Sequence, residues 1–186
     1  MNLPLNHEQL IGRIPAESFN YLFFWGHHED SETPTKACLS QWYASSFTVD
    51  GKEYATAEHF MMSRKARLFK DERCEEQIIA CSHPSEAKKM GRMIANFDEN
   101  IWNQHKFAIV VQASVEKFSQ NPPLLAFLLS TSNRILVEAS PADPIWGIGL
   151  AQDHRDATDP KKWKGPNLLG FALMTARAKF LTALKS

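Results

Sequence analysis

The feature that most constrains the fold is a long helical segment with clear signals at both ends. Asp98 is a residue type that caps helix N-termini, and a helix is predicted from about Glu99 to Ser119. The sequence NPP at Asn121–Pro123 ends this helix, because proline lacks a backbone N–H and clashes with the preceding turn. Helical packing therefore dominates this part of the chain.

Other segments extend this pattern on both sides. Further helices are predicted at residues 54–69, 71–82, 82–97, 123–131 and 167–184, with Ser82 or His83 as a cap before Pro84. The helix at 123–131 is expected to be short and buried. A buried strand is predicted at 21–26, a second strand at 134–140, and a hairpin at 39–56 around the Asp50–Gly51 turn. A mostly helical chain with a few short strands is typical of an α+β fold.

The chain has 186 residues and no internal repeat, which predicts one domain. Residues 1–18 are polar and interrupted by proline, so we interpret them as an N-terminal extension, with the domain at 19–186. Residues 141–166 form a long loop rich in glycine and proline that carries Trp146 and Trp163. Loops of this length are usually functional or disordered, and the tryptophans argue against disorder.

Composition excludes several classes of function. The chain has 21 Lys plus Arg residues and 21 Asp plus Glu residues, so broad non-specific binding to nucleic acid is disfavoured. A local basic pocket is still compatible with this balance. Cys38, Cys74 and Cys81 form neither a disulfide framework nor a zinc motif, which favours the cytoplasm. We expect no signal peptide and no membrane span. His and Asp in GHHED and DHRDATD lack metal-site spacing, so we expect no metal and no cofactor.

One acidic residue, Glu58, occupies an unusual place in the 54–69 segment. On a helical wheel Glu58 and Lys65 lie near the middle of the apolar arc, while the polar sector contains His59 and Ser63. A charged residue is rarely buried without a partner or a task. Two interpretations stay open: an ion pair that only holds the fold, or a carboxylate that points into a pocket.

A second carboxylate lies in the sequence DPIWGIG. Asp143 precedes Pro144, which keeps it out of helical geometry, and Trp146 follows closely. Asp143 either bonds the backbone of its own turn or lines a pocket beside an aromatic face. The spacing of Gly147 and Gly149 does not match a dinucleotide fingerprint, because Gln152 stands where the third glycine belongs.

The remaining candidates are single residues. Trp102, at the start of the long helix, is either a core residue or a platform for a ligand. Each of Lys65, Lys88, Lys89 and Arg92 is either a solvated surface charge or a phosphate contact. No nucleophile motif of the GxSxG type and no phosphate-binding P-loop is present.

Several motifs together resemble the YbiA-like family, also called NADAR, over residues 21–181. They are FFWG, LSQWYASSFTVDGKEYATAEHFMMSRKA, ANFDENIW, KF at 117–118, LLSTSNRILVEASPADPIWGIG and GPNLLGFALM. The chain departs from the family at LSQWYASSF, where many relatives have LSNFYPS. Gln41 and Trp42 therefore replace a small amide and a phenylalanine.

The resemblance implies an α+β N-glycosidase with active-site residues at Glu58, Trp102, Asp143 and Trp146. Some members of the family are N-glycosidases of ribosylamino-pyrimidine phosphates, the early intermediates of riboflavin synthesis, and release ribose 5-phosphate. Others resemble hydrolases that remove ADP-ribose from guanine in nucleic acid. We expect Glu58 and Asp143 to be catalytic, with Trp102, Trp146, Lys65 and Arg92 binding a small phosphorylated substrate. A non-catalytic module that binds ADP-ribose or a nucleotide is the remaining alternative.

Overall fold

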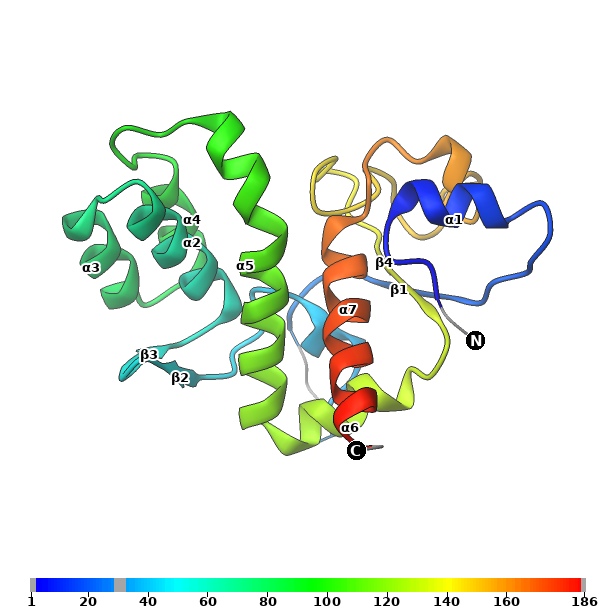
Figure 1. Cartoon of the computed structure of the whole chain (residues 1–186), viewed down its shortest axis with the longest axis horizontal. Helices are drawn as coiled ribbons and strands as arrows, with labels where there is room; N and C mark the ends of the chain where they lie inside the picture. The colour runs from blue at the N-terminus through cyan, green and yellow to red at the C-terminus, as the bar shows by residue number, and fades with distance from the viewer. Residues whose placement is uncertain (1–2, 29–32, 185–186) are drawn as a thin grey trace. The chain divides into compact units, whose positions relative to one another are not determined.

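The computed structural model describes residues 3–28 and 33–184, and Figure 1 shows their helices and strands. The helices are α1 His7–Arg13, α2 Ala57–Leu68, α3 Glu72–Ala80, α4 Pro84–Gly91, α5 Glu99–Gln120, α6 Pro122–Ser130 and α7 Leu168–Ala183. The strands are β1 Tyr21–Phe24, β2 Phe47–Val49, β3 Lys52–Tyr54 and β4 Ile135–Glu138, and the 3-10 turns are η1 Lys36–Leu39 and η2 Pro160–Lys162. The predicted α+β class is confirmed.

The contacts along the chain divide it into two compact units. One unit comprises residues 41–125, and the other comprises residues 1–40 together with 126–186. Each unit is described by itself.

In the unit of residues 41–125, the predicted hairpin is present. Strands β2 and β3 pair antiparallel, and Phe47 lies opposite Tyr54. Asp50 and Gly51 both have positive φ angles, of 52° and 74°, as a tight turn between antiparallel strands requires. The hairpin turns Phe47, Val49 and Tyr54 toward one buried cluster.

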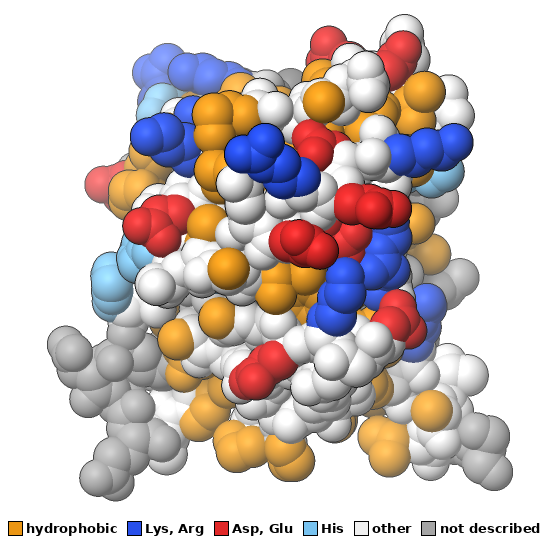
Figure 2. Space-filling model, turned by 90° about the vertical axis from the view of Figure 1, so that its left-hand side faces the viewer, with side chains coloured by type: hydrophobic (Ala, Val, Ile, Leu, Met, Phe, Trp, Pro, Cys, Tyr) orange, Lys and Arg blue, Asp and Glu red, His pale blue; other side chains and the backbone are white. Residues whose placement is uncertain are grey.

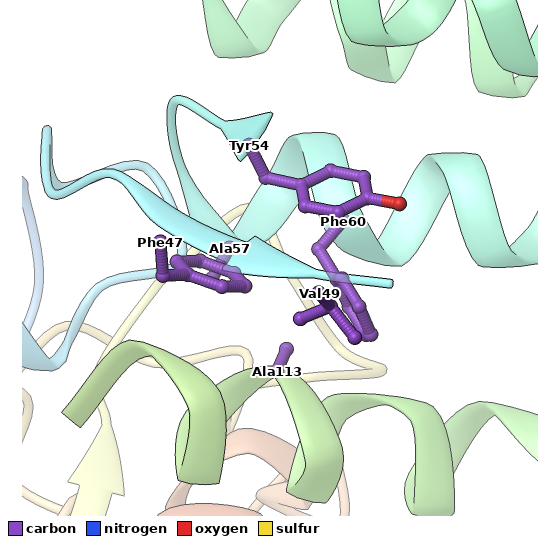
Figure 3. Close-up of a cluster of buried hydrophobic side chains, with 6 residues drawn as sticks. All are labelled: Phe47, Val49, Tyr54, Ala57, Phe60 and Ala113. Carbon is purple, nitrogen blue, oxygen red and sulfur yellow. The ribbon is translucent and has the colours of Figure 1, made fainter. Parts of the chain in front are cut away.

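That cluster is the apolar core of this unit (Figure 3). It consists of Phe47, Val49, Tyr54, Ala57, Phe60 and Ala113, so the hairpin, α2 and α5 all contribute to it. The ring of Tyr54 meets the ring of Phe60 edge-on, with centroids 5.1 Å apart. Helix α2 also packs against α3 and α4, which leaves little of its surface exposed.

The polar sector predicted for α2 is therefore wrong at two residues. His59 and Ser63 are fully buried. The ring nitrogens of His59 contact Thr56 Oγ1 at 2.8 Å and the carbonyl oxygen of Cys81 at 3.1 Å. A helical wheel shows one helix alone, whereas α2 has neighbours on several sides that accept these polar atoms.

Some predicted helix boundaries also need correction. Helix α2 begins at Ala57 and not at Tyr54, because Thr56 caps it and Tyr54 belongs to β3. Helix α4 begins as predicted, with His83 as its cap, but it ends at Gly91 and does not continue to Phe97. The cap of α5 at Asp98 is confirmed, since its side chain accepts a hydrogen bond from the backbone N–H of Ile101 at 3.0 Å.

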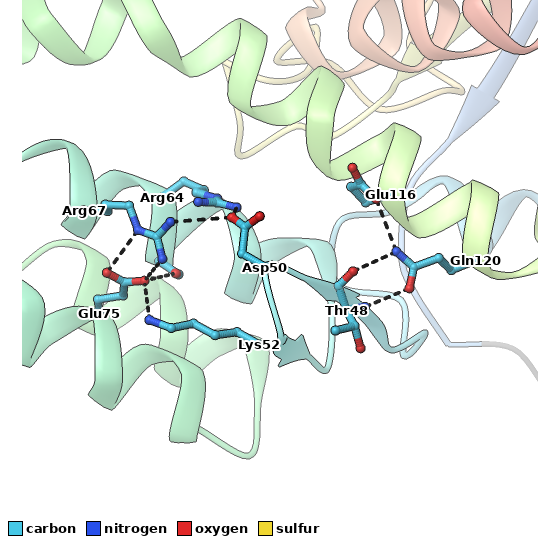
Figure 4. A network of polar contacts seen from close by, with 9 residues as sticks. Thr48, Asp50, Lys52, Arg64, Arg67, Glu75, Glu116 and Gln120 are labelled. Carbon is cyan, nitrogen blue, oxygen red and sulfur yellow. Dashed lines mark hydrogen bonds and ion pairs between the residues drawn. The ribbon is translucent and has the colours of Figure 1, made fainter.

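A charged network ties α3 to α2 and the hairpin (Figure 4). The carboxylate of Glu75, which is 5% exposed, accepts hydrogen bonds from Arg67 at 2.7 Å and Lys52 at 3.0 Å. Asp50 accepts a hydrogen bond from Arg64 at 2.8 Å. Burial by itself raises the pKa of Glu75, but the bonds from Arg67 and Lys52 outweigh it and hold that pKa below its usual value.

In the unit of residues 1–40 and 126–186, both predicted strands are present. Strands β1 and β4 pair parallel, with Tyr21 opposite Ile135 and Phe24 opposite Glu138. Helix α7 packs against β4. The buried side chain of Asn167 joins them, because its Nδ2 donates to the carbonyl of Leu136 at 2.8 Å and its Oδ1 accepts from the N–H of Glu138 at 2.9 Å.

The segment interpreted as an N-terminal extension contains a packed helix. Leu10 of α1 is fully buried. His7 contacts the carbonyl oxygen of Pro160 at 2.8 Å and stacks on the ring of Trp163. The domain boundary at residue 19 stays a prediction. Helix α6 was predicted to be buried, but only Leu124 and Leu128 are buried among its residues.

Candidate active site

The six residues predicted from the sequence lie in both units. Glu58, Lys65, Arg92 and Trp102 belong to the unit of residues 41–125, whereas Asp143 and Trp146 belong to the other unit. The first group is positioned by helices, and the second by a loop.

Glu58 occupies the first turn of α2. Thr56 caps the helix, and the backbone N–H of Glu58 donates a hydrogen bond to the carbonyl of Gln41 at 3.0 Å. The residue is 3% exposed, so the wheel was right to turn it inward. An acidic residue near a helix N-terminus is stabilised by the helix dipole, which offsets part of the cost of burial.

Lys65 lies two turns along α2 from Glu58, in contact with two aromatic rings. Its ammonium donates to the carbonyl of Gly91 at 2.7 Å and lies 4.2 Å from the ring centroid of Phe97 and 5.5 Å from that of Trp102. Burial lowers the pKa of Lys65, and the charge of Glu58 acts in the opposite direction but more weakly. Its immediate surroundings are therefore aromatic faces and one carbonyl.

Trp102 and Arg92 differ in exposure. Trp102 is half-buried in the first turn of α5, with the ammonium of Lys65 against its ring. Arg92 is exposed at the C-terminal end of α4. The structure thus brings Lys65 and Trp102 together, while Arg92 presents its charge to solvent. Phe97, which sequence analysis did not single out, completes this aromatic group and is 45% exposed.

Asp143 lies in the loop that follows β4. Its Oδ1 accepts hydrogen bonds from the backbone N–H groups of Ile145 at 2.9 Å and Trp146 at 2.8 Å. This is the turn that the sequence allowed as one interpretation of DPIWGIG. Within residues 3–28 and 33–184, Oδ2 makes no hydrogen bond. Asp143 is half-buried, and its Oδ1 orients the loop.

The backbone around Trp146 is held on two sides. The carbonyl of Trp146 accepts from the N–H of Leu169 at 3.0 Å, and the N–H of Ile148 donates to the carbonyl of Glu138 at 2.9 Å. A Cβ at Gly147 would lie 2.6 Å from that carbonyl oxygen, so only glycine allows this approach. The loop therefore holds Asp143 and Trp146 in a defined arrangement.

The sequence profile of the NADAR domain family matches residues 23–181 of this chain. The chain belongs to the NADAR domain family. An N-glycosidase of Acanthamoeba polyphaga mimivirus is 42% identical over 87% of this chain and 96% of its own length. N-glycosidase YbiA of Escherichia coli strain K12 is 34% identical over 75% of this chain and 78% of its own length.

A solved structure supports the NADAR assignment. The NMR structure of the E. coli protein YbiA is similar with a TM-score of 0.73 and 29% sequence identity, and the match covers 99% of this chain and 96% of that one. The family predicted from the motifs is thereby confirmed. The roles of the six site residues stay predictions.

The side chains that commonly bind metal ions occur across the described residues of the chain. In residues 3–28 and 33–184, no group of three or more His, Cys, Asp or Glu side chains is arranged to hold a metal ion. None of the helices within these ranges is long and apolar enough to cross a membrane.

Proposed function

We propose that this chain hydrolyses the N-glycosidic bond of ribosylamino-pyrimidine phosphates and releases ribose 5-phosphate. The proposal is supported by family membership and by relatives whose names describe them as N-glycosidases. The single observation that carries it is Glu58, a carboxylate buried in the first turn of α2 within the matched region.

Glu58 and Asp143 are the proposed catalytic residues. Hydrolysis breaks the bond between C1′ and the amine nitrogen, adds the hydroxyl of water to C1′ and returns a proton to the leaving amine. The sugar passes through an oxocarbenium-like state, which a carboxylate stabilises. One carboxyl group activates the water or supports the cation, and the other delivers the proton. The assignment of these two roles between Glu58 and Asp143 stays open.

The tryptophans and cations are proposed to hold the substrate. Trp102 and Trp146 offer aromatic faces that stack on a base or sugar and exclude water. Lys65 supplies a positive charge beside the ring of Trp102, and Arg92 offers an exposed guanidinium for the phosphate. The partner is a small phosphorylated molecule, and the reaction needs no redox step.

We also propose a cytoplasmic location. Cys38, Cys74 and Cys81 form no disulfide within residues 3–28 and 33–184, and burial is the main factor that raises the pKa values of Cys74 and Cys81. Cysteines that form no disulfide are typical of proteins in a reducing compartment.

The proposal is tested by turnover of a matched pair of variants. Glu58→Gln keeps the size of the side chain but removes its charge, and Glu53→Gln makes the same change on an exposed residue of β3. Release of ribose 5-phosphate from ribosylamino-pyrimidine phosphate should be abolished in the first variant and unchanged in the second. Near-wild-type release by Glu58→Gln, with the fold intact by circular dichroism, would contradict the assignment.

Two further probes address the two alternative functions. Release of the base from ADP-ribosyl-guanosine tests for a hydrolase that removes ADP-ribose from guanine. Calorimetry with ADP-ribose tests for a non-catalytic binding module. On the face shown in Figure 2, acidic and basic side chains are interspersed. This pattern does not favour an extended basic surface that binds nucleic acid on that face. Binding of ADP-ribose without turnover of any glycoside, unchanged in Glu58→Ala, would favour a non-catalytic module instead.

A further inference from the structure

Gln41 is a buried amide next to the proposed catalytic helix. Its backbone carbonyl accepts the N–H of Glu58 at 3.0 Å, so the main chain of Gln41 is anchored at the first turn of α2. The residue is only 7% exposed. Among residues 3–28 and 33–184, neither Oε1 nor Nε2 of this side chain has a hydrogen-bond partner.

A second buried amide shows what a structural role looks like in this protein. Asn167 is fully buried, and both of its polar atoms are bonded to backbone groups of β4. Leaving a buried polar group without a partner destabilises a protein, and a leucine or methionine of similar volume would avoid that cost. Gln41 therefore does not stabilise the fold in the way that Asn167 does. Such an exception calls for a functional explanation.

We propose that Gln41 is a specificity-determining residue that reads the lactam edge of the base, an inference that rests on the proposed N-glycosidase function. A carboxamide presents an acceptor and a donor side by side. A lactam presents a ring N–H next to a C=O, which is the complementary pair. Oε1 accepts from the ring N–H, and Nε2 donates to the carbonyl. Two parallel bonds of this kind discriminate between bases by about 10- to 100-fold.

The lactam edge occurs in two classes of base. A pyrimidinone carries it, and so does guanine, so Gln41 recognises a feature common to the proposed substrate and to the ADP-ribosylated alternative. A site that provides hydrogen bonds for a lactam rejects an analogue that lacks the N–H, because its own polar atoms are then left unpaired. Methylation of the ring nitrogen removes this N–H and adds bulk at the same position.

The test compares Gln41→Leu with wild type on a lactam substrate and on its ring-N-methyl analogue. Gln104→Leu, on an exposed glutamine of α5, is the matched control. Wild type and the control should prefer the unmethylated ribosylamino-pyrimidine phosphate by about 10- to 100-fold in kcat/KM. Gln41→Leu should lose that preference to within about threefold. Its melting temperature should stay equal or rise, because an unsatisfied buried amide has been removed.

A second arm measures binding without catalysis. Calorimetry with uracil, 3-methyluracil, guanosine and 1-methylguanosine shows which lactam the wild type binds and whether methylation or Gln41→Leu removes the preference. Retained discrimination by Gln41→Leu, or a fall in its melting temperature like that of Asn167→Leu, would overturn the role of Gln41. A third outcome separates the two proposals. If wild type turns over no substrate but binds a base with an affinity that falls on methylation and in Gln41→Leu, the proposed hydrolysis is overturned and the role of Gln41 stands.

Discussion

Glu58 and Asp143 are held in contrasting ways. Glu58 lies in a helix that packs against three others, and it is 3% exposed. Asp143 is half-buried in a loop and is oriented by two backbone N–H groups. The position of the first carboxylate is set by helix packing, whereas that of the second is set by its own turn.

This difference predicts how activity and stability respond when each carboxylate is substituted. A residue inside a packed helix cannot move to compensate for a shorter side chain, because neighbouring helices fix the backbone. If Asp143 is catalytic as proposed, a substitution there should change both activity and local stability, because its carboxylate also accepts the hydrogen bonds of its own turn. We therefore expect a shortened side chain at Glu58 to lower activity, and removal of the side chain at Asp143 to lower both activity and stability.

The largest effect is expected at the loop carboxylate. Asp143→Asn keeps an oxygen for the N–H groups of Ile145 and Trp146, so its fold should survive while kcat falls about 100- to 10,000-fold. Asp143→Ala should lose as much activity and, in addition, about 1 kcal/mol of unfolding free energy. Steady-state kinetics and urea denaturation measure the two effects. Equal stability of the two variants would show that the turn does not depend on this side chain.

The next effect tests the rigidity of the helix. Glu58→Asp shortens the carboxylate by one methylene on a backbone that cannot follow, so kcat should fall on the order of 100-fold. The matched change Glu53→Asp, on exposed β3, should leave kcat unchanged. Turnover of Glu58→Asp within threefold of wild type would mean that the helix adapts, and the contrast with Asp143 would fail.

A smaller effect, on stability, is expected at Gly147. A Cβ there would meet the carbonyl oxygen of Glu138 at 2.6 Å, so Gly147→Ala should cost about 2 kcal/mol of unfolding free energy through overpacking. Gly12→Ala in α1 is the control, because its Cβ would meet nothing within 4 Å. Chemical denaturation compares the two variants. If both prove equally stable, the loop around Asp143 is not held as tightly as proposed.

The smallest effect concerns the attachment of α3 to α2. The pKa of Glu75 is lowered in the folded state, so its stabilisation is present above the unfolded pKa of about 4.3 and is lost as the pH falls through the folded value. Glu75→Gln should lower the unfolding free energy by about 1–2 kcal/mol at pH 7, since Lys52 and Arg67 are partly exposed.

The pH dependence separates this effect from a loss of packing. The difference between wild type and Glu75→Gln should shrink as the pH falls below about 4, while exposed Glu76→Gln should show no difference at either pH. Thermal unfolding at pH 7 and at about pH 3 measures this. A difference that does not depend on pH would mean that the charge of Glu75 contributes nothing.

The sequence alone was enough to predict the class of fold, most elements and the family. Local signals account for this, since caps such as Asp98 and His83 and the Asp50–Gly51 turn act within a few residues. The inward direction of Glu58 was also predictable, because it follows from the spacing of apolar residues on one helix.

Tertiary structure decided what surrounds each side chain. His59 and Ser63 are buried because neighbouring segments supply partners such as Cys81 and Glu75, which no wheel of α2 can show. The unpaired amide of Gln41 is likewise invisible in the sequence, which marked this residue only as a departure from its relatives. Local patterns determine which elements form, but burial and hydrogen bonding depend on residues that are distant in the chain, and folding alone brings these together.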